Sequence, residues 1–248
     1  MTKYWKLSLL AAIAYALFML YLLPAAWLVK WAGLPPAVVI GQVQGTLWQG
    51  TATVVQYQGL QFQQVHWRFN GWSLLRLAPE FQLTAGNVAA RQQPYATAGL
   101  GYSFSGIEVK QALLRIPVSQ LLPLIELPLP VAASGELLVE IQDYQQGQPW
   151  CSRLTGNASW LDAQLQPPTG TWLELNSIVA DLRCEQGSPV LITNGNNSLG
   201  LAVTAAVDNN RLTVNGTLKP DASLPQEVHQ AMQFVGRPDA EGRYTIRF

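Results

Sequence analysis

The side chains that could do chemistry are few and scattered. The chain holds two histidines, His66 and His229, and each falls on the polar side of an expected element, where an imidazole is usually solvated. Ser103 lies in the run Gly101–Gly106, which comes near the nucleophile-elbow pattern of hydrolases, but Ser105 stands where that pattern needs its second glycine. We expect a turn between strands there. A hydrolase that uses Ser103 stays an alternative, which Ser103→Ala tests.

Acidic residues also occur in pairs, Glu136 with Glu140 and Asp181 with Glu185. Acid–base catalysis needs carboxylates whose pKa is shifted by burial or by close neighbours, and these pairs carry no sign of burial. Walker loops, calcium loops and zinc-type cysteine–histidine spacings do not occur in the sequence. The sequence therefore predicts no catalytic residue, no metal and no cofactor, and a protein that is not an enzyme.

The two cysteines, Cys151 and Cys184, form an even pair. In an oxidising compartment such a pair predicts a disulfide. Closing a loop of this size stabilises a fold by roughly 3 to 4 kcal/mol in the chain-entropy estimate. Two buried free thiols are the alternative. A metal site is disfavoured because two cysteines without a nearby histidine make an incomplete ligand set.

The segment that decides the compartment is the run Leu7–Val29, which holds no charged side chain. As a helix it rises roughly 35 Å at about 1.5 Å per residue, enough to cross a bilayer core of about 30 Å. Pro24 would end the helix early and leave Leu7–Leu23 as a shorter span. Aromatic residues flank the run as interfacial anchors do: Tyr4, Trp5, Trp27 and Trp31.

Basic residues set the expected orientation of this anchor. Lys3, Lys6 and the terminal amine precede the run, and only Lys30 closely follows it. The positive-inside rule then places the N-terminus in the cytoplasm and exports the remainder. A cleaved signal peptide is the alternative, but the run is longer than a signal h-region and ends in a poor cleavage sequence. We expect residues 1–6 in the cytoplasm, 7–29 in the membrane and 30–248 in an exported domain.

The exported region has the two-residue periodicity of β-strands almost throughout. Val65, Trp67 and Phe69 alternate with polar residues, and the pattern recurs at Leu137–Ile141, Leu212–Leu218 and Tyr244–Phe248. The predicted fold class is mainly β, with a single N-terminal transmembrane helix followed by an elongated, curved antiparallel sheet and few short helices. Turn residues separate the runs, at Asn70-Gly71, Gln146-Gly147, Asn194-Gly195 and Asp208-Asn209-Asn210.

Helices are expected at few places. Pro225–Val235 has proline near its start, apolar residues on one face and Gly236 beyond its end. Val118–Ile125 is a second candidate, interrupted by Pro123. The proline-rich stretch 123–134 is a natural boundary between an earlier and a later sub-domain, although prolines on a sheet edge would look the same.

Composition limits the partners. Charged residues are 12% of the chain, about half the usual share, and no basic patch supports nucleic-acid binding. Such a surface fits other proteins or apolar ligands better than polyanions. Among the nine tryptophans, four fall where an inward ring would pack against a strand, with ligand stacking as the alternative: Trp48, Trp67, Trp160 and Trp172.

The stretch Gly45-Thr46-Leu47-Trp48-Gln49-Gly50, soon after a single anchor, resembles the N protein family of the bacterial type II secretion system. The resemblance spans almost the whole chain in order. It implies a bacterial inner-membrane protein with its bulk in the periplasm, serving an apparatus that exports folded proteins across the outer membrane, with no catalytic residue to carry over. The other matching positions are Cys151 with Cys184, Leu199-Gly200-Leu201, Val235-Gly236-Arg237-Pro238-Asp239 and Gly242-Arg243-Tyr244.

Two hypotheses follow. The first is a non-enzymatic scaffold or assembly factor that contacts other inner-membrane and periplasmic components of the apparatus, and the lipid bilayer through its anchor. The second is a periplasmic β-groove protein that binds lipid or passes it between membranes, motivated by long amphipathic strands, few charges and abundant tryptophan. The second hypothesis predicts an apolar channel tens of ångströms long, and a concave side filled by the sheet's own side chains would exclude it.

Overall fold

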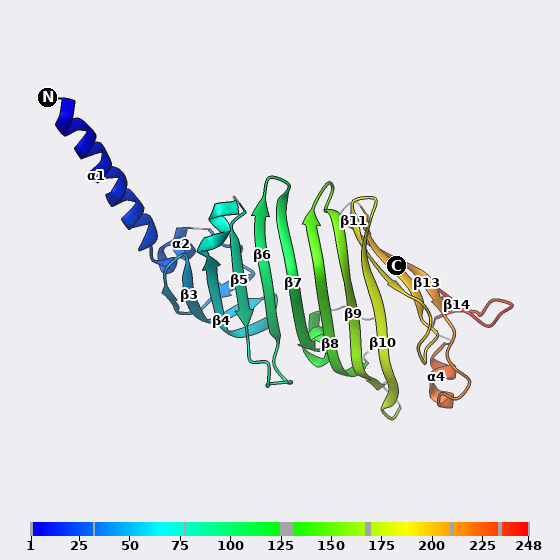
Figure 1. Cartoon of the computed structure of the whole chain (residues 1–248). Helices are drawn as coiled ribbons and strands as arrows, with labels where there is room; N and C mark the ends of the chain where they lie inside the picture. The colour runs from blue at the N-terminus through cyan, green and yellow to red at the C-terminus, as the bar shows by residue number, and fades with distance from the viewer. Residues whose placement is uncertain are drawn as a thin grey trace.

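The protein is an N-terminal helix followed by one long antiparallel sheet (Figure 1). The computed structural model describes residues 2–31, 33–76, 78–124, 131–166, 170–208, 211–232 and 235–247. The predicted mainly β class, with an apolar N-terminal helix and few other helices, is confirmed. Several predicted positions lie outside the described residues: residue 1 of the expected cytoplasmic segment, 209–210 of a turn, 125–130 of the proposed boundary and of the helix before it, 233–234 of the last expected helix, and Phe248.

Helix α1 (Thr2–Tyr21) contains an apolar segment long enough to cross a membrane, Tyr4–Tyr21, and none of that segment is buried. A helix that is apolar on all sides and exposed along its length is typical of a membrane span. It ends at Tyr21, as the shorter alternative allowed, because Pro24 lacks the N–H that another turn would need. A second helix, α2 (Ala25–Trp31), follows the break.

Within the described residues, fourteen strands form one sheet in which each strand from β2 onward pairs with the next along the chain. Strand β1 is the exception, since it also pairs with β3. Every pairing is antiparallel, as short runs bounded by turn residues predict. The strands are β1 (Val38–Ile40), β2 (Val43–Gly45), β3 (Gln49–Tyr57), β4 (Leu60–Asn70), β5 (Glu80–Ala85), β6 (Tyr95–Ser103), β7 (Gly106–Pro117), β8 (Ala132–Gln146), β9 (Cys151–Gln166), β10 (Leu173–Glu185), β11 (Ser188–Thr193), β12 (Ala202–Asp208), β13 (Arg211–Leu218) and β14 (Tyr244–Arg247).

The strand registers separate an apolar face from a polar face. Residues paired across neighbouring strands lie on the same side of a sheet, and the predicted alternation at Val65, Trp67 and Phe69 is confirmed by their burial against exposed His66 and Arg68. The polar face carries these two side chains with Gln82 and Lys110. One row of partners crosses β5 to β10 on the apolar face: Ala85, Ala96, Leu114, Val139, Ala158 and Ala180.

Three side chains depart from the predicted pattern. Trp48 lies in the turn before β3, where its ring packs against Phe69. The other two are exposed. Trp172 precedes β10 instead of lying in a strand and is 46% exposed. Leu212, the second residue of β13, is 65% exposed. Both lie near strand ends, where the sheet no longer covers them.

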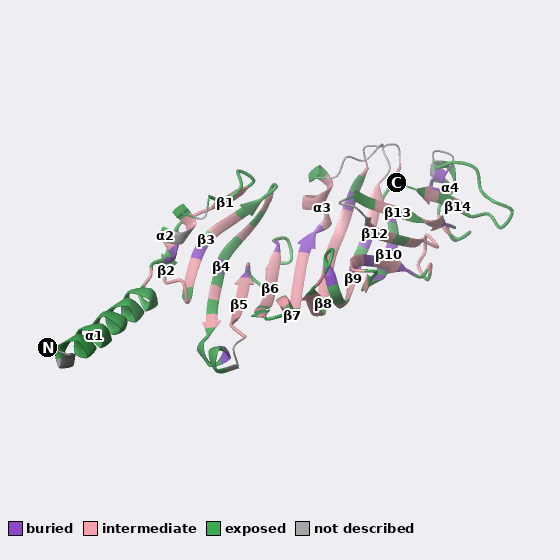
Figure 2. Ribbon diagram, turned by 90° about the horizontal axis from the view of Figure 1, so that it is seen from above, coloured by how far each residue is buried: buried purple, intermediate pink, exposed green. Residues whose placement is uncertain are grey.

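The sheet is curved (Figure 2). Non-glycine residues with positive φ lie within strands at Gln111, Asp162 and Asn176, beside register shifts in the β6–β7, β8–β9 and β9–β10 pairs. Such bulges bend a strand and increase its twist. At the N-terminal part of the sheet, the β3–β4 turn at Gly59 comes against Leu124, which lies 65 positions later in the chain. The first strands therefore curl towards β7 and β8.

The apolar face is filled differently along the sheet. Near its C-terminal part, β10 buries Leu175, Ile178 and Ala180 to between 1% and 8% exposure. Near its N-terminal part a smaller core contains Ala52, Val65 and Ala85, with partly buried side chains around it. The face is thus closed by its own side chains at β10 and more open near β4.

The short helices follow the predicted segments. After β7 come α3 (Val118–Leu121) and the 3-10 helix η2 (Leu122–Leu124), and α4 (Gln226–Ala231) begins directly after Pro225. A 3-10 helix, η1 (Gly71–Arg76), occupies the predicted turn after β4. Strands β7 and β8, which flank the proline-rich stretch, pair directly with each other, so the sheet continues across it.

Cys151 and Cys184 form the predicted disulfide, with an S–S distance of 2.00 Å and a Cα–Cα distance of 6.1 Å. The bond joins the first residue of β9 to the end of β10. Cys151 is 1% exposed. It ties together two strands that already pair over nine registered positions.

We expect the double variant Cys151→Ser, Cys184→Ser to lower the free energy of unfolding by roughly 3 to 4 kcal/mol, because the unfolded chain regains the entropy of an open loop of 33 residues. Urea unfolding of the full chain in detergent micelles, followed by tryptophan fluorescence, measures the change. Ser105→Ala in the exposed β6–β7 turn is the control. A loss below about 1 kcal/mol contradicts the loop-entropy account.

Candidate functional site

The Gly45–Gly50 stretch forms the turn between β2 and β3, where α1 meets the sheet (Figure 1). Gly45 pairs with Gly50 across the turn, and the Thr46 N–H donates to the Gln49 carbonyl at 2.8 Å. This tight hairpin places Leu47 and Trp48 at its tip. We call residues 45–50 together with Leu20–Pro24 the helix–sheet joint.

Two hydrogen bonds connect the turn to the C-terminal end of α1. The Trp48 indole Nε1–H donates to the Leu20 carbonyl at 3.0 Å, and the Leu47 backbone N–H donates to the Leu23 carbonyl at 3.0 Å. The last carbonyls of an α-helix have no partner within the helix. The Trp48 indole therefore supplies a donor to the last turn of α1, and the Leu47 amide supplies one to the segment just after the helix, each hydrogen bond contributing on the order of 1 kcal/mol.

Thr46 extends the joint into the sheet. It forms an isolated β-bridge with Pro24, and its carbonyl accepts a hydrogen bond from the Trp67 indole Nε1–H at 3.1 Å. Ala25, the next residue of the chain, is 5% exposed. The segment between α1 and α2 is thus bound to the turn through Pro24, and the turn is bound to β4 through Trp67.

The two glycines of the motif are required by close approach. Gly45 has a φ of +95°, which side-chain-bearing residues rarely adopt. A Cβ at Gly50 would overlap the Trp67 ring and the Gln44 carbonyl. Glycine at both positions is what allows the turn to close over Trp67.

Aromatic rings continue the joint across the sheet. The Trp48 and Phe69 ring centroids lie 5.0 Å apart, and those of Phe69 and Phe81 lie 4.9 Å apart. Both spacings fall in the range of favourable aromatic pairs. The Phe69 N–H also donates to the Trp48 carbonyl at 2.6 Å. The indole that contacts α1 is therefore held by rings of β4 and β5.

An apolar cavity of about 370 Å³ lies beside the joint, and we call it the groove. Helix α2 forms one wall through Ala25 and Val29, and β1 to β6 form the other, with Val65, Leu83 and Leu100 among the lining side chains. Trp67 supplies an indole N–H, which is already bonded to the Thr46 carbonyl. A cavity with this lining suits an apolar occupant.

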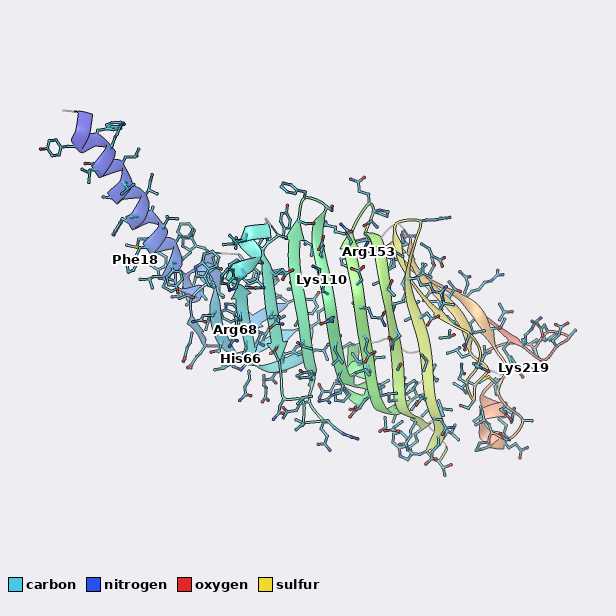
Figure 3. The ribbon with its side chains drawn as sticks, viewed as in Figure 1. Phe18, His66, Arg68, Lys110, Arg153 and Lys219 are labelled. Atoms are coloured by element: carbon cyan, nitrogen blue, oxygen red, sulfur yellow. A yellow bond between two sulfur atoms is a disulfide. The ribbon has the colours of Figure 1, made fainter. Side chains whose placement is uncertain are left out.

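The polar face carries a second hollow, of about 550 Å³, over the same strands. His66 and Arg68 of β4 and Gln82 and Thr84 of β5 line it; Figure 3 labels the first two. The prediction that His66 is a solvated polar-face residue is confirmed, since the residue is exposed. Amides, a guanidinium and an imidazole make this hollow a polar surface suited to hydrogen-bonded contacts.

Ser103 does not have the geometry of a hydrolase nucleophile. It closes β6, its hydroxyl donates to Glu108 Oε1 at 2.8 Å, and the two-residue turn Phe104-Ser105 follows. A nucleophile elbow instead joins a strand to a helix and places its serine beside a histidine. Ser103 stabilises a β-hairpin.

The acidic pairs and histidines do not come together into a site. Asp181 forms an exposed ion pair with Arg183 at 3.0 Å, and Glu136 and Glu140 lie along β8. Across the part of the chain that the structure describes, no cluster of three or more His, Cys, Asp or Glu side chains is arranged to hold a metal ion.

The C-terminal matching positions form a turn centred on Asp239. Its Oδ1 accepts from the backbone N–H of Arg243 at 2.8 Å and of Glu241 at 3.0 Å, and its Oδ2 accepts from Arg243 Nε at 2.9 Å. Gly242 has a φ of +77° in this turn, and Tyr244 opens β14 opposite Leu218. The Asp239 turn thus directs the last strand onto β13.

Hydrogen bonding shifts the acidity of this carboxyl group. The backbone N–H of Arg243, with smaller contributions from its guanidinium and from the Glu241 N–H, holds the pKa of Asp239 below its ordinary value of 3.8. In return, the Asp239 carboxylate raises the pKa of Arg243. The turn is solvent-exposed, so its charged side chains stabilise the backbone of the turn itself and nothing beyond it.

The Leu199-Gly200-Leu201 stretch closes the loop between β11 and β12. Gly200 N–H donates to the Asn197 carbonyl at 2.8 Å, and the Leu201 N–H donates to Asn197 Oδ1 at 3.0 Å. Lys219, just after β13, donates its N–H to the Leu199 carbonyl at 3.1 Å. The matching positions therefore do not converge on one site; they lie at the joint, at the β9–β10 disulfide, in this loop and in the Asp239 turn.

The groove and the role of the joint are not evident from the sequence. Alternation indicated which residues face the apolar side, but it could not show that α2 packs against β2 and lines one side of the groove. For the joint a signal existed, since a Gly-Thr-Leu-Trp turn soon after an apolar helix offers an indole donor near unpaired helix carbonyls.

A family model described as "Type II secretion system (T2SS), protein N" matches residues 36–247. Relatives named type II secretion system protein N include those of Aeromonas hydrophila and Vibrio cholerae. That of Aeromonas hydrophila is 32% identical over 98% of this chain and 96% of its own. That of Vibrio cholerae is 28% identical over 90% of this chain and 89% of its own length. No solved structure was found to match.

We expect Gly50→Ala to lower the free energy of unfolding by about 1 to 3 kcal/mol, because the new methyl must displace the Trp67 ring or the Gln44 carbonyl. Gly71→Ala is the matched control, since an added Cβ there meets no atom within 4 Å. Urea unfolding of both full-length variants measures the difference. Equal stabilities would show that the turn does not need glycine at position 50.

For Asp239 we expect a carboxyl titration below 3.8 in the folded chain. Because the folded-state pKa is the lower one, the carboxylate stabilises the turn above about pH 4, and this contribution is lost as the pH falls through the folded-state pKa. Carbon-13 NMR measures the titration. Arg243→Gln should raise the pKa, whereas Arg183→Gln, on β10, should not. A wild-type value at or above 3.8 refutes the assignment.

Proposed function

The chain belongs to the type II secretion system protein N family, and from this premise we propose that it is a membrane-anchored scaffold on which other parts of the secretion apparatus assemble. Family membership makes it a structural component of that apparatus and not an enzyme. The single observation that carries the scaffold role is the helix–sheet joint, in which the Trp48 indole and the Leu47 amide bind the end of α1.

A joint of this kind gives the sheet a defined direction relative to the membrane. A flexible linker would let the sheet turn freely, whereas two hydrogen bonds, a β-bridge and tilted aromatic pairs hold it against the helix end. An assembly factor gains from such a restraint, since less orientational freedom is lost when a partner binds.

The proposed orientation places residues 1–6 in the cytoplasm, the span within 7–29 in the inner membrane and residues 30–248 in the periplasm. Lys3 and Lys6 before the span support it through the positive-inside rule. The Cys151–Cys184 disulfide supports it because such bonds persist in oxidising compartments.

The surface proposed for docking is the polar face of β4 to β9. It offers Arg68 on β4, Gln82 on β5, Lys110 on β7 and Arg153 on β9, and Figure 3 labels the three cationic side chains. Its ion pairs are exposed, so each contributes little to stability, with a median of about 0 to 1 kcal/mol, and can exchange for partner contacts. Confinement to the membrane raises the effective concentration of partners, so weak contacts suffice.

We expect a chain whose α1 is replaced by a cleavable signal peptide to fail to restore secretion in a deletion strain at native expression levels. Release from the membrane forfeits an avidity gain of about 10² to 10⁴. Secreted enzyme in the medium measures the effect, and overproduction should rescue it in part. An unrelated single-span helix in place of α1 is the control and should restore secretion better than the released domain.

In-cell photo-cross-linking from Gln82 and Arg153 tests the docking face. Cross-links to other secretion components from these positions, and fewer from Val29 in the groove, are the expected result. Undiminished secretion in the deletion strain together with no cross-links from the polar face would refute the scaffold role.

A further inference from the structure

The groove is an apolar space that the chain does not fill. Near β10 the same face of the sheet buries its own residues almost completely, as Leu175 at 1% exposure shows. Beside α2 the facing side chains instead leave about 370 Å³ between Val29, Leu83 and Leu100. Apolar surface left open in water costs free energy in proportion to its area, so an apolar occupant would stabilise this end of the sheet.

The groove lies close to the end of the membrane-spanning helix α1, and therefore close to membrane lipid. Its wall begins at Ala25, four positions after α1 ends at Tyr21. Helix α2 buries Ala25 and lines the groove with Val29, while Trp27 and Trp31 on its other side are 62% and 84% exposed. Exposed tryptophans with Lys30 next to them are typical of a helix at the membrane interface.

The strand ends next to the joint carry further exposed apolar side chains. The register places η1 and the β6–β7 turn at the same end of the sheet as the start of β3, because Gln49 pairs with Arg68, Asn70 with Glu80, and Glu80 with Gly101. Figure 1 shows both turns on the side from which α1 rises. We call their exposed side chains the apolar rim: Trp72, Leu74, Leu75, Tyr102, Phe104 and Ile107.

The apolar rim is too exposed to serve the fold. Phe104 is 96% exposed, Trp72 79% and Leu75 77%, and residues 71–79 contain no carboxylate. Exposed apolar patches of this kind mark contact with a protein or a membrane. At this end of the sheet α1 already enters a bilayer. Aromatic and leucine side chains are the ones that insert into the interface of a bilayer.

We propose that the groove holds an acyl chain of a lipid from the bilayer in which α1 lies, with the apolar rim resting on the membrane surface. The proposal rests on the membrane anchorage of α1 but not on the scaffold role. It is a proposal for binding and not for passage between membranes, because burial of Leu175, Ile178 and Ala180 closes the apolar face at β10.

The test uses the full chain in vesicles of phosphatidylethanolamine and phosphatidylglycerol that contain a phospholipid with a diazirine near the end of one acyl chain. After irradiation, mass spectrometry locates the labelled peptides. Label on α1 reports anchorage. The expected further label lies on β4 and β5 peptides that line the groove, and label confined to α1 and the apolar rim overturns the proposal.

Leu100→Trp fills the groove and should lower the β4 and β5 label about tenfold, since losing contact with about two methylenes has this effect, while α1 label is unchanged. Val179→Trp is the matched control, because Val179 is 51% exposed on the polar face of β10. An intact disulfide and an unchanged unfolding midpoint verify folding, and Val29→Trp replaces Leu100→Trp if that variant misfolds. Equal groove labelling in the groove-filling and control variants overturns the proposal.

Discussion

The structure depends on the need to remove one face of a single-layer sheet from water. An antiparallel sheet of 14 strands has an apolar side that nothing in a single layer automatically covers. Here bulges at Gln111, Asp162 and Asn176 accompany its curvature, so that the β3–β4 turn reaches Leu124. Near β10 the side chains close the face themselves, and near β4 the face stays open as the groove, with helix α2 along one wall.

The same constraint explains why the joint is built as it is. Helix α1 must end where the chain leaves an apolar environment, and its last carbonyls need donors there. The Trp48 indole supplies one to the last turn of α1, and the Leu47 N–H donates to the Leu23 carbonyl just after the helix. The Trp67 ring lies against Gly50. A stretch that resembles a family motif therefore has a structural task, namely to attach a long sheet to a membrane helix in a fixed direction.

This arrangement separates two surfaces with different properties. The polar face presents spaced charges and amides to the aqueous side, whereas the groove and the apolar rim lie beside the anchor. For a component of a secretion apparatus, such a separation lets protein contacts and lipid contacts occur on the same chain without competing. Neither surface requires a catalytic residue, in agreement with Ser103 bonded to Glu108 within a hairpin.

The sequence by itself determined the apolar helix, the strand alternation at Val65–Phe69, most turns and the cysteine pair, because each depends on local periodicity or on residue type. It misjudged Trp172 and Leu212, since exposure near strand ends depends on neighbours remote in the chain. Only the tertiary structure decided that Trp48 contacts Leu20, that α2 packs against β2 and lines one side of the groove, and that the apolar face is open at one part and closed at another. Those features depend on how the whole sheet curves, because each strand adds a small bend. A local sequence pattern does not show that overall curvature.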